Sequence, residues 1–321
     1  MKKLFASALL IASALFAKTD INSLPNSLPM SSYIVKEVGS GEVLMSKNKN
    51  KKIAPASLTK ILTSILAIES GKLGEYVTIT KEATGVEPTK AGFRVGDEVL
   101  LLDLVKAALV NSSNDAATAI GIYVGGSTAN FAEMMNKKAG EIGMANSHFT
   151  NACGFDKGSH YSTADDLLKL SEYAIKNRVF NEIVKLDSVA IQPRNSDKTY
   201  RLRTHNKLLD KYQYAIGVKT GYTNKAGGCL IARAKKDDKD VLVIMLKSKT
   251  DRWVLAEDIF EKAFTMTKPE EEIVEDEHLQ KESGYIAKNN KSKKHARTKR
   301  VAKTKSSKKR EASVKTSKNR G

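Results

Sequence analysis

The sequence predicts an α+β fold, in which an antiparallel sheet packs against helices. Near the start, strand-like residues 33–38 and 42–45 flank the glycine-containing turn 39–41, a hairpin pattern. Near the end, apolar residues 229–234 and 241–246 flank a charged turn and predict a second hairpin. Because the apolar spacing between these pairs is mainly helical, strands and helices should form separate layers.

Residues 55–70 have the strongest helical pattern in the chain. Pro55 precedes the run and Gly71 follows it, and these residue types often begin and end a helix. Apolar residues three and four positions apart give the run one apolar stripe, which predicts a buried helix. The stripe consists of Leu58, Ile61, Leu62, Ile65 and Leu66.

Shorter patterns predict the remaining elements, with residues 47–52 as a solvated basic loop and 111–115 as a polar break between two helices. The predicted helices are 100–109, 116–124, 131–144, 166–176 and 253–264, and the predicted strand segments are 76–80, 189–192, 199–203 and 214–220.

The first seventeen residues resemble an export signal. Lys2 and Lys3 precede the apolar run 4–16, and Ala17 offers a small residue for cleavage. The run is short of the roughly 20 residues that span a bilayer. We therefore expect residues 1–17 to be a signal peptide and the protein to be exported to the periplasm or cell envelope. Cleavage after Ala14 and an uncleaved anchor are the alternatives.

The net charge of +18 is concentrated at the end of the chain. Residues 288–321 hold fifteen Lys or Arg and one acid, whereas 270–277 hold six acids. We expect residues 18–30 to be a flexible lead and 269–321 to be a disordered tail that is first acidic and then basic. The basic part would suit anionic membrane surfaces or wall polymers, and export argues against nucleic acid. A solubilising extension without a partner is the alternative.

No metal site or cofactor is expected. His148 and His160 are isolated, without the spacing of a metal-ligand cluster, and local hydrogen bonding accounts for each. Cys153 and Cys229 are the two cysteines. An exported protein can join such a pair, but isolated cysteines are often small buried groups, so both readings stay open.

Ser57 and Lys60 form an S-x-x-K motif at the start of the 55–70 helix. Residues three apart share a helix face. A serine hydroxyl becomes a good nucleophile when a nearby base takes its proton, and lysine serves as that base when burial or a second cation lowers its pKa. The alternative is that Ser57 caps the helix and Lys60 is solvated.

Two further motifs follow in the order Ser112-x-Asn114 and Lys219-Thr220-Gly221. The first falls at the polar break between helices, and the second ends a predicted strand. Taken alone, Ser112 and Asn114 could simply cap the following helix. Together, S-x-x-K, S-x-N and K-T-G are a signature of penicillin-binding proteins and class A β-lactamases.

The residues around these motifs resemble the low-molecular-mass D-alanyl-D-alanine carboxypeptidases. The resemblance covers about residues 31–267 and implies a β-lactamase/transpeptidase-like fold, with a largely helical subdomain that holds the S-x-N turn. Residues 31–268 would then be a penicillin-binding D,D-peptidase domain. The matching segments are PASLTK, SSNDAA, FAEMMNKKAGEIGM, HYSTADDL and GVKTGYTNKAGGCL.

The resemblance also implies catalytic roles. Ser57 would attack the carbonyl between two D-alanines and form an acyl-enzyme, with Lys60 as its base. Ser112 and Lys219 would relay a proton to the departing D-alanine. Asn114 would position the substrate amide.

Substrate contacts follow from the same resemblance. The backbone N–H groups of Ser57 and Tyr222 would form an oxyanion hole. Thr220, with Gly221 beside it, and Arg252 would receive the substrate's terminal carboxylate, since arginine binds carboxylates through a planar fork. The alternative for Arg252 is a solvated arginine at the start of a surface helix.

The implied activity is removal of the terminal D-alanine from peptidoglycan pentapeptides. No counterpart of the class A β-lactamase deacylating glutamate can be assigned, so β-lactams should act as slowly released covalent inhibitors. The alternatives are a D,D-endopeptidase that cuts cross-links, a β-lactamase, and a non-catalytic wall-binding module tethered by its tail.

Two features depart from the family pattern. Relatives usually carry a β-rich second domain and an amphipathic anchoring helix, whereas the 53 residues that follow Lys268 here are too polar for either, which puts anchoring by a terminal helix in doubt. Cys153 lies in the sequence NACGF, where relatives tend to show Pro-His-Gly-Leu, and we expect this difference to be structural.

Overall fold

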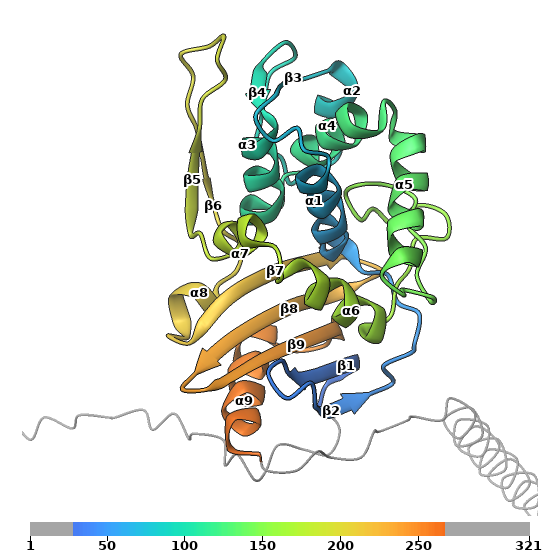
Figure 1. Cartoon of the computed structure of the whole chain (residues 1–321), viewed down its shortest axis with the longest axis vertical. Coiled ribbons are helices and arrows are strands. Elements are labelled where there is room, and N and C mark those ends of the chain that lie inside the picture. Colours follow the sequence, from blue (N-terminus) through green and yellow to red (C-terminus); the bar gives the residue numbers. More distant parts are fainter. Residues whose placement is uncertain (1–27, 267–321) are drawn as a thin grey trace, which may run out of the picture. The chain divides into compact units, whose positions relative to one another are not determined.

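A five-stranded antiparallel sheet lies at the centre of the computed structural model, which describes residues 28–266 (Figure 1). The strand order is β2-β1-β9-β8-β7, so the first and last strand pairs of the sequence meet in one sheet. The predicted α+β class is confirmed, and both predicted hairpins are present. The strands are β1 (Met30–Glu37), β2 (Val43–Lys47), β7 (Ala215–Thr223), β8 (Gly227–Lys236) and β9 (Lys239–Ser248).

Alternating side chains give the sheet two buried faces. In β9, Val243 and Met245 pack into one apolar cluster with helix α9 (Arg252–Thr265), whereas Leu242 and Ile244 join the larger cluster on the other face. Successive side chains of a strand point to opposite faces, so one strand contributes to both cores. The sheet is therefore covered by α9 on one side and by the main helical layer on the other (Figure 1).

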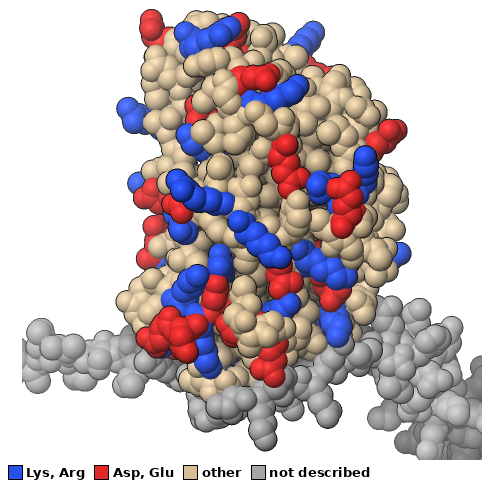
Figure 2. All heavy atoms as spheres, in the orientation of Figure 1, with Lys and Arg blue, Asp and Glu red and all other residues tan. Residues whose placement is uncertain are grey.

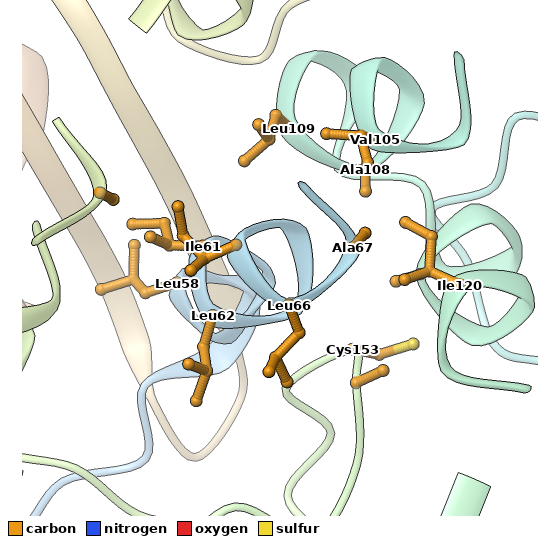
Figure 3. Packing of buried hydrophobic residues seen from close by; sticks show 14 of the residues in the cluster. Leu58, Ile61, Leu62, Leu66, Ala67, Val105, Ala108, Leu109, Ile120 and Cys153 are labelled. Carbon is orange, nitrogen blue, oxygen red and sulfur yellow. The ribbon is translucent and has the colours of Figure 1, made fainter. Parts of the chain in front are cut away.

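Helix α1 (Lys60–Glu69) lies inside the helical layer and continues the short 3-10 helix η2 (Ala56–Thr59). Figure 3 shows side chains from neighbouring helices around it, including Leu109 and Ile120. The predicted stripe is buried, which confirms the helix and explains why it is rigidly held.

Several of the other helices pack around α1, and the remaining elements pack on these helices or on the sheet (Figure 1). Helix α3 continues into a π-helical segment, η3, which ends at the polar break before α4. These elements are β3 (Tyr76–Thr78), α2 (Lys81–Thr84), β4 (Glu98–Leu100), α3 (Leu101–Lys106), η3 (Ala107–Asn111), α4 (Asn114–Gly125), α5 (Thr128–Glu141), α6 (Ala164–Ala174), α7 (Arg178–Val184), β5 (Ser188–Ile191), β6 (Tyr200–Arg203) and α8 (Leu208–Lys211).

Several local predictions need correction. Lys47 was expected in a solvated loop, but it is the last residue of β2 and is only 3% exposed. The strand continues past the apolar residues 43–45 from which it was predicted, and so it includes Lys47. The short elements α2, β4, α7 and α8 were missed. Met30, placed in the flexible lead, begins β1. The predictions for residues 1–17, for residues 18–27 of the lead and for 269–321 lie outside the described residues.

The described surface carries both signs of charge. On the face drawn in Figure 2, lysines and arginines are interspersed with acids. None of the helices within residues 28–266 has the length and apolar character needed to cross a membrane.

Candidate active site

Ser57 and Lys60 lie together at the junction of η2 and α1. The Lys60 Nζ donates a hydrogen bond of 2.8 Å to the Ser57 Oγ and one of 2.7 Å to the carbonyl oxygen of Cys153. Lys60 is fully buried, and this burial lowers its pKa from the ordinary 10.5 to about 8, against the smaller raising effects of Cys153 and Asp115. The alternative of a solvated Lys60 beside a capping serine is therefore wrong.

Close backbone contacts fix the start of η2. Gly154 has φ +89°, and a Cβ built on it would lie 1.9 Å from the carbonyl oxygen of Ala56. On the other side, a Cβ at Gly221 would lie 3.2 Å from the Ser57 nitrogen. Ser57 is thus held between the 151–155 loop and strand β7, and glycine is the residue that lets the backbone approach so closely.

The S-x-N turn links helices η3 and α4. Ser112 adopts a left-handed conformation with φ 64° and is 6% exposed. The N-cap of α4 is Ser113, so capping does not account for Asn114. Instead, the Asn114 side chain donates to the carbonyl oxygen of Glu87 over 2.9 Å, and its backbone N–H donates to that of Thr89 over 2.7 Å.

Asp115 extends this support and was not among the predicted site residues. Its buried carboxylate accepts hydrogen bonds of 2.9 Å from the N–H groups of Ala91 and Gly92. Asn114 and Asp115 together hold residues 87–92 in place. The position of Asp115 directly after the S-x-N motif was a signal that could have drawn attention to it.

Lys219 lies in β7 and is 1% exposed. Burial lowers its pKa well below the ordinary value, with further lowering by the positive charges of Lys60 and Arg252. Its Nζ donates to the carbonyl oxygen of Thr220 over 3.1 Å. The two lysines of the S-x-x-K and K-T-G motifs therefore lie near enough to influence each other.

Arg252 is the first residue of α9, which agrees with the alternative that it begins a helix. It is partly buried, however, and not fully solvated as that alternative expected. Its Nη1 donates to the carbonyl oxygen of Gly221 over 2.8 Å, and its guanidinium lies 4.7 Å from the Trp253 ring centre. These contacts tie the arginine to the K-T-G strand, in which Thr220 is buried.

These elements surround a cleft of about 420 Å³. Ser57, Ser112, Asn114 and Tyr222 line it, and the Tyr222 side chain is 65% exposed. The cleft has the volume of a small-molecule or peptide site. A nucleophile with a buried amine behind it can perform acyl transfer in such a cleft.

Asn151 shapes the loop on which Lys60 depends, and it too was missed. Its Oδ1 accepts hydrogen bonds from the N–H groups of Cys153, Gly154 and Phe155 over 2.8–3.2 Å. This arrangement turns the carbonyl of Cys153 toward Lys60. No short sequence motif signals such a contact.

The cysteines and histidines have structural partners. Cys153 and Cys229 are buried and free, so no bridge joins them. The Nδ1 of buried His160 accepts from the N–H of Thr150 over 3.0 Å, its Nε2 lies 2.9 Å from the Thr59 Oγ1, and burial lowers its pKa to about 4. Local hydrogen bonding therefore explains His160. Residues 28–266 contain no group of three His, Cys, Asp or Glu arranged to bind a metal ion.

The chain is similar to known D,D-peptidases. The family model described as D-alanyl-D-alanine carboxypeptidase (Peptidase_S11) matches residues 19–250. The D-alanyl-D-alanine carboxypeptidases DacF of Bacillus subtilis and DacC of Escherichia coli are 32% and 34% identical over 69% and 76% of this chain. The matches cover 58% and 62% of those two relatives, so the chain spans about three fifths of their length.

Two solved structures show the same similarity in three dimensions. The D-alanyl-D-alanine carboxypeptidase DacD of Francisella tularensis matches with a TM-score of 0.69 and 26% identity, and the match covers 74% of this chain and 71% of the DacD chain. The Streptomyces K15 DD-transpeptidase matches with a TM-score of 0.70 and 27% identity, and the match covers 75% of this chain and 98% of the transpeptidase chain.

Proposed function

The chain belongs to the D-alanyl-D-alanine carboxypeptidase family, and we propose that it removes the terminal D-alanine from peptidoglycan stem peptides. The observation that carries the proposal is the 2.8 Å contact between the Ser57 Oγ and the fully buried Nζ of Lys60. This pair supplies a nucleophile and a base at the wall of a peptide-sized cleft.

In the first step, the Ser57 Oγ attacks the carbonyl carbon between the two D-alanines, and its proton passes to neutral Lys60. A pKa of about 8 leaves about one Lys60 in ten neutral at pH 7, far more than for an ordinary lysine. Burial produces this lowering, against the smaller raising effects of Cys153 and Asp115. Lys60 is therefore suited to act as a base near neutral pH.

Ser112 and Lys219 would then return the proton to the departing amine. Ser112 lines the cleft, and the left-handed turn fixes its backbone. The C–N bond breaks, D-alanine leaves with the proton, and the remaining peptide stays esterified to Ser57. Asn114 would orient the substrate amide from the same turn.

Backbone and cationic groups would hold the substrate's oxygens. The N–H groups of Ser57 and Tyr222 are suited to the developing oxyanion, because Gly221 brings β7 close to the Ser57 nitrogen. Arg252 has five N–H donors, so its bond to the Gly221 carbonyl leaves others for the terminal carboxylate. Thr220 would supply a hydroxyl to the same group.

Water would hydrolyse the acyl-enzyme and complete the reaction. β-Lactams would acylate Ser57 in the same way and leave slowly, as covalent inhibitors. A peptide ending in Lys-D-Ala-D-Ala, a cross-linked dimer and a fluorescent penicillin test the proposal together. D-Alanine release from the peptide supports the carboxypeptidase. Cleavage of the dimer alone favours the endopeptidase, and failure of all three favours a non-catalytic module.

Export to the cell envelope, periplasmic in a cell with two membranes, is part of the proposal, because peptidoglycan lies outside the cytoplasm and residues 1–17 resemble a signal peptide. The basic residues 288–321 would attach the enzyme to anionic lipid or wall polymers, at about 1 kcal/mol per lysine near an anionic membrane. Sedimentation with anionic vesicles tests this. Binding that is lost in high salt and on deletion of 288–321 supports it, and unchanged binding contradicts it.

A further inference from the structure

Glu87 is the charged residue among those that line the cleft. The carboxylate is exposed, and within residues 28–266 the structure gives it no hydrogen-bond or ion-pair partner. The other charged groups of the site are the cations Lys60, Lys219 and Arg252, which contact Ser57, Thr220 and Gly221, and the buried Asp115 carboxylate, which accepts hydrogen bonds from backbone N–H groups. The site therefore combines cations near β7 and the nucleophile with one cleft-lining anion, Glu87, near the S-x-N turn.

The backbone that carries Glu87 is firmly held. Asn114 donates from its side chain to the Glu87 carbonyl over 2.9 Å and from its backbone to the Thr89 carbonyl over 2.7 Å. The buried Asp115 carboxylate holds the following residues through Ala91 and Gly92. Glu87 thus projects from a fixed support directly beside Asn114, and fixed positioning favours a binding role.

The proposed substrate orientation determines what meets this carboxylate. The terminal carboxylate would lie at Arg252 and the scissile carbonyl at Ser57. Asn114 would hold an amide of the chain that precedes the scissile bond, so the cleft-lining Glu87 would meet the side chain of the residue before the two D-alanines. A carboxylate at that point attracts a primary ammonium.

We propose that Glu87 forms an anionic subsite for the free side-chain ammonium of the residue preceding D-Ala-D-Ala, an inference that rests on the proposed carboxypeptidase function. Acylation of this amine, as in a cross-linked stem, removes the positive charge. The subsite therefore favours stems whose amine is free over stems whose amine is already joined to another chain.

The expected preference is modest because Glu87 is exposed. Exposed ion pairs stabilise weakly, so kcat/KM should be about two- to fivefold higher for a peptide ending in Lys-D-Ala-D-Ala than for the same peptide with Nε-acetyl-lysine. High salt should reduce this preference, since ions screen exposed charges.

The test compares these two peptides with the wild-type protein, Glu87→Gln, Glu87→Lys and the control Glu133→Gln, an exposed glutamate on α5 away from the cleft. The ratio of the two kcat/KM values should fall to about one in Glu87→Gln, drop below one in Glu87→Lys, and keep its wild-type value in Glu133→Gln. Fluorescent penicillin labelling of Ser57 verifies that each variant is folded.

Two results would overturn the Glu87 subsite and leave the proposed carboxypeptidase function standing. One is a ratio in Glu87→Gln equal to that of the wild type. The other is an equal loss of kcat on both peptides, which would make Glu87 a proton-transfer group. Release of D-alanine from neither peptide by the wild-type protein overturns the carboxypeptidase function and the subsite with it.

Discussion

At the scale of single residues, Lys60 is the group whose environment most directly links structure to chemistry. It is fully buried between the Ser57 hydroxyl and the Cys153 carbonyl. Burial disfavours its charged form and lowers its pKa to about 8. The same burial therefore favours the neutral amine that the proposed base requires and imposes an energetic cost on the folded protein.

The rate of acylation by penicillin should follow the neutral fraction of Lys60. The second-order rate constant should rise about tenfold per pH unit below pH 8 and level off above it, because only neutral Lys60 accepts the serine proton. Stopped-flow measurement with a fluorescent penicillin gives this profile. Lys60→Arg should lose about 100-fold or more, since arginine stays charged. A rate that is flat from pH 6 to 9 would contradict the role.

Lys60→Met should stabilise the protein while inactivating it. The folded pKa of about 8 lies below the ordinary 10.5, so the unfolded chain binds more protons between these values and stability rises with pH across that window. The penalty is complete below pH 8, and its removal should raise the free energy of unfolding by about 1 to 3 kcal/mol at pH 7.

Urea unfolding of Lys60→Met at pH 7 and pH 10 measures this effect, with Ser57→Ala as an inactive control that keeps the lysine. The difference from wild type should shrink at pH 10. Equal destabilisation at both pH values would show that the contacts of Lys60 outweigh its desolvation.

At the scale of elements, the 151–155 loop determines where η2 begins. Gly154→Ala would place a Cβ 1.9 Å from the Ala56 carbonyl oxygen, so we expect a loss of about 2 to 4 kcal/mol and weaker penicillin labelling. Gly158→Ala is the matched control, because its φ is +58° but its nearest neighbour lies 4.0 Å away. Thermal unfolding should show a loss of about 1 kcal/mol there. Similar losses in both variants would mean that backbone strain, not the contact with Ala56, is responsible.

The 87–92 segment depends on helix α4 through Asp115. Asp115→Asn replaces one acceptor oxygen with an NH₂ that faces a backbone N–H, so we expect about 1 to 3 kcal/mol lower stability and a higher KM for peptide. Asp103→Asn, which removes only the 2.7 Å surface ion pair with Lys106, should cost less than about 1 kcal/mol. Unchanged KM in Asp115→Asn would show that this segment does not help to form the substrate site.

At the scale of the whole molecule, the sequence predicted the elements whose apolar pattern was long and regular. Residues 241–246 alternate between two cores, and residues 58–66 form one buried stripe, so tertiary packing reinforced the local pattern. Short helices such as α7 and α8 escaped prediction because a few residues carry little periodicity, and tertiary contacts stabilise them.

In the candidate site, too, the residues with a local sequence pattern were predicted and those that depend on tertiary contacts were not. Ser57, Lys60, Ser112, Asn114 and Lys219 were proposed because each belongs to a short motif. Ser57, Ser112 and Asn114 line one cleft, Lys60 donates to the Ser57 Oγ, and Lys219 lies near enough to Lys60 for their charges to interact. Asn151 and Gly154 act through backbone groups distant in sequence, so no spacing within the chain signalled them. Asp115 also acts on distant backbone groups, and its only sequence signal was its position directly after the S-x-N motif. Their roles depend on which loops the fold places side by side.

Mass spectrometry of the protein incubated with a peptide ending in Lys-D-Ala-D-Ala, alongside Ser57→Ala, measures both the proposed carboxypeptidase activity and its dependence on Ser57. We expect the wild type to release one D-alanine per peptide and Ser57→Ala to release none, because the acyl-enzyme requires the Ser57 Oγ. An intact peptide with wild-type protein would contradict the proposed carboxypeptidase activity, and equal release by Ser57→Ala would contradict the role of Ser57 as the nucleophile.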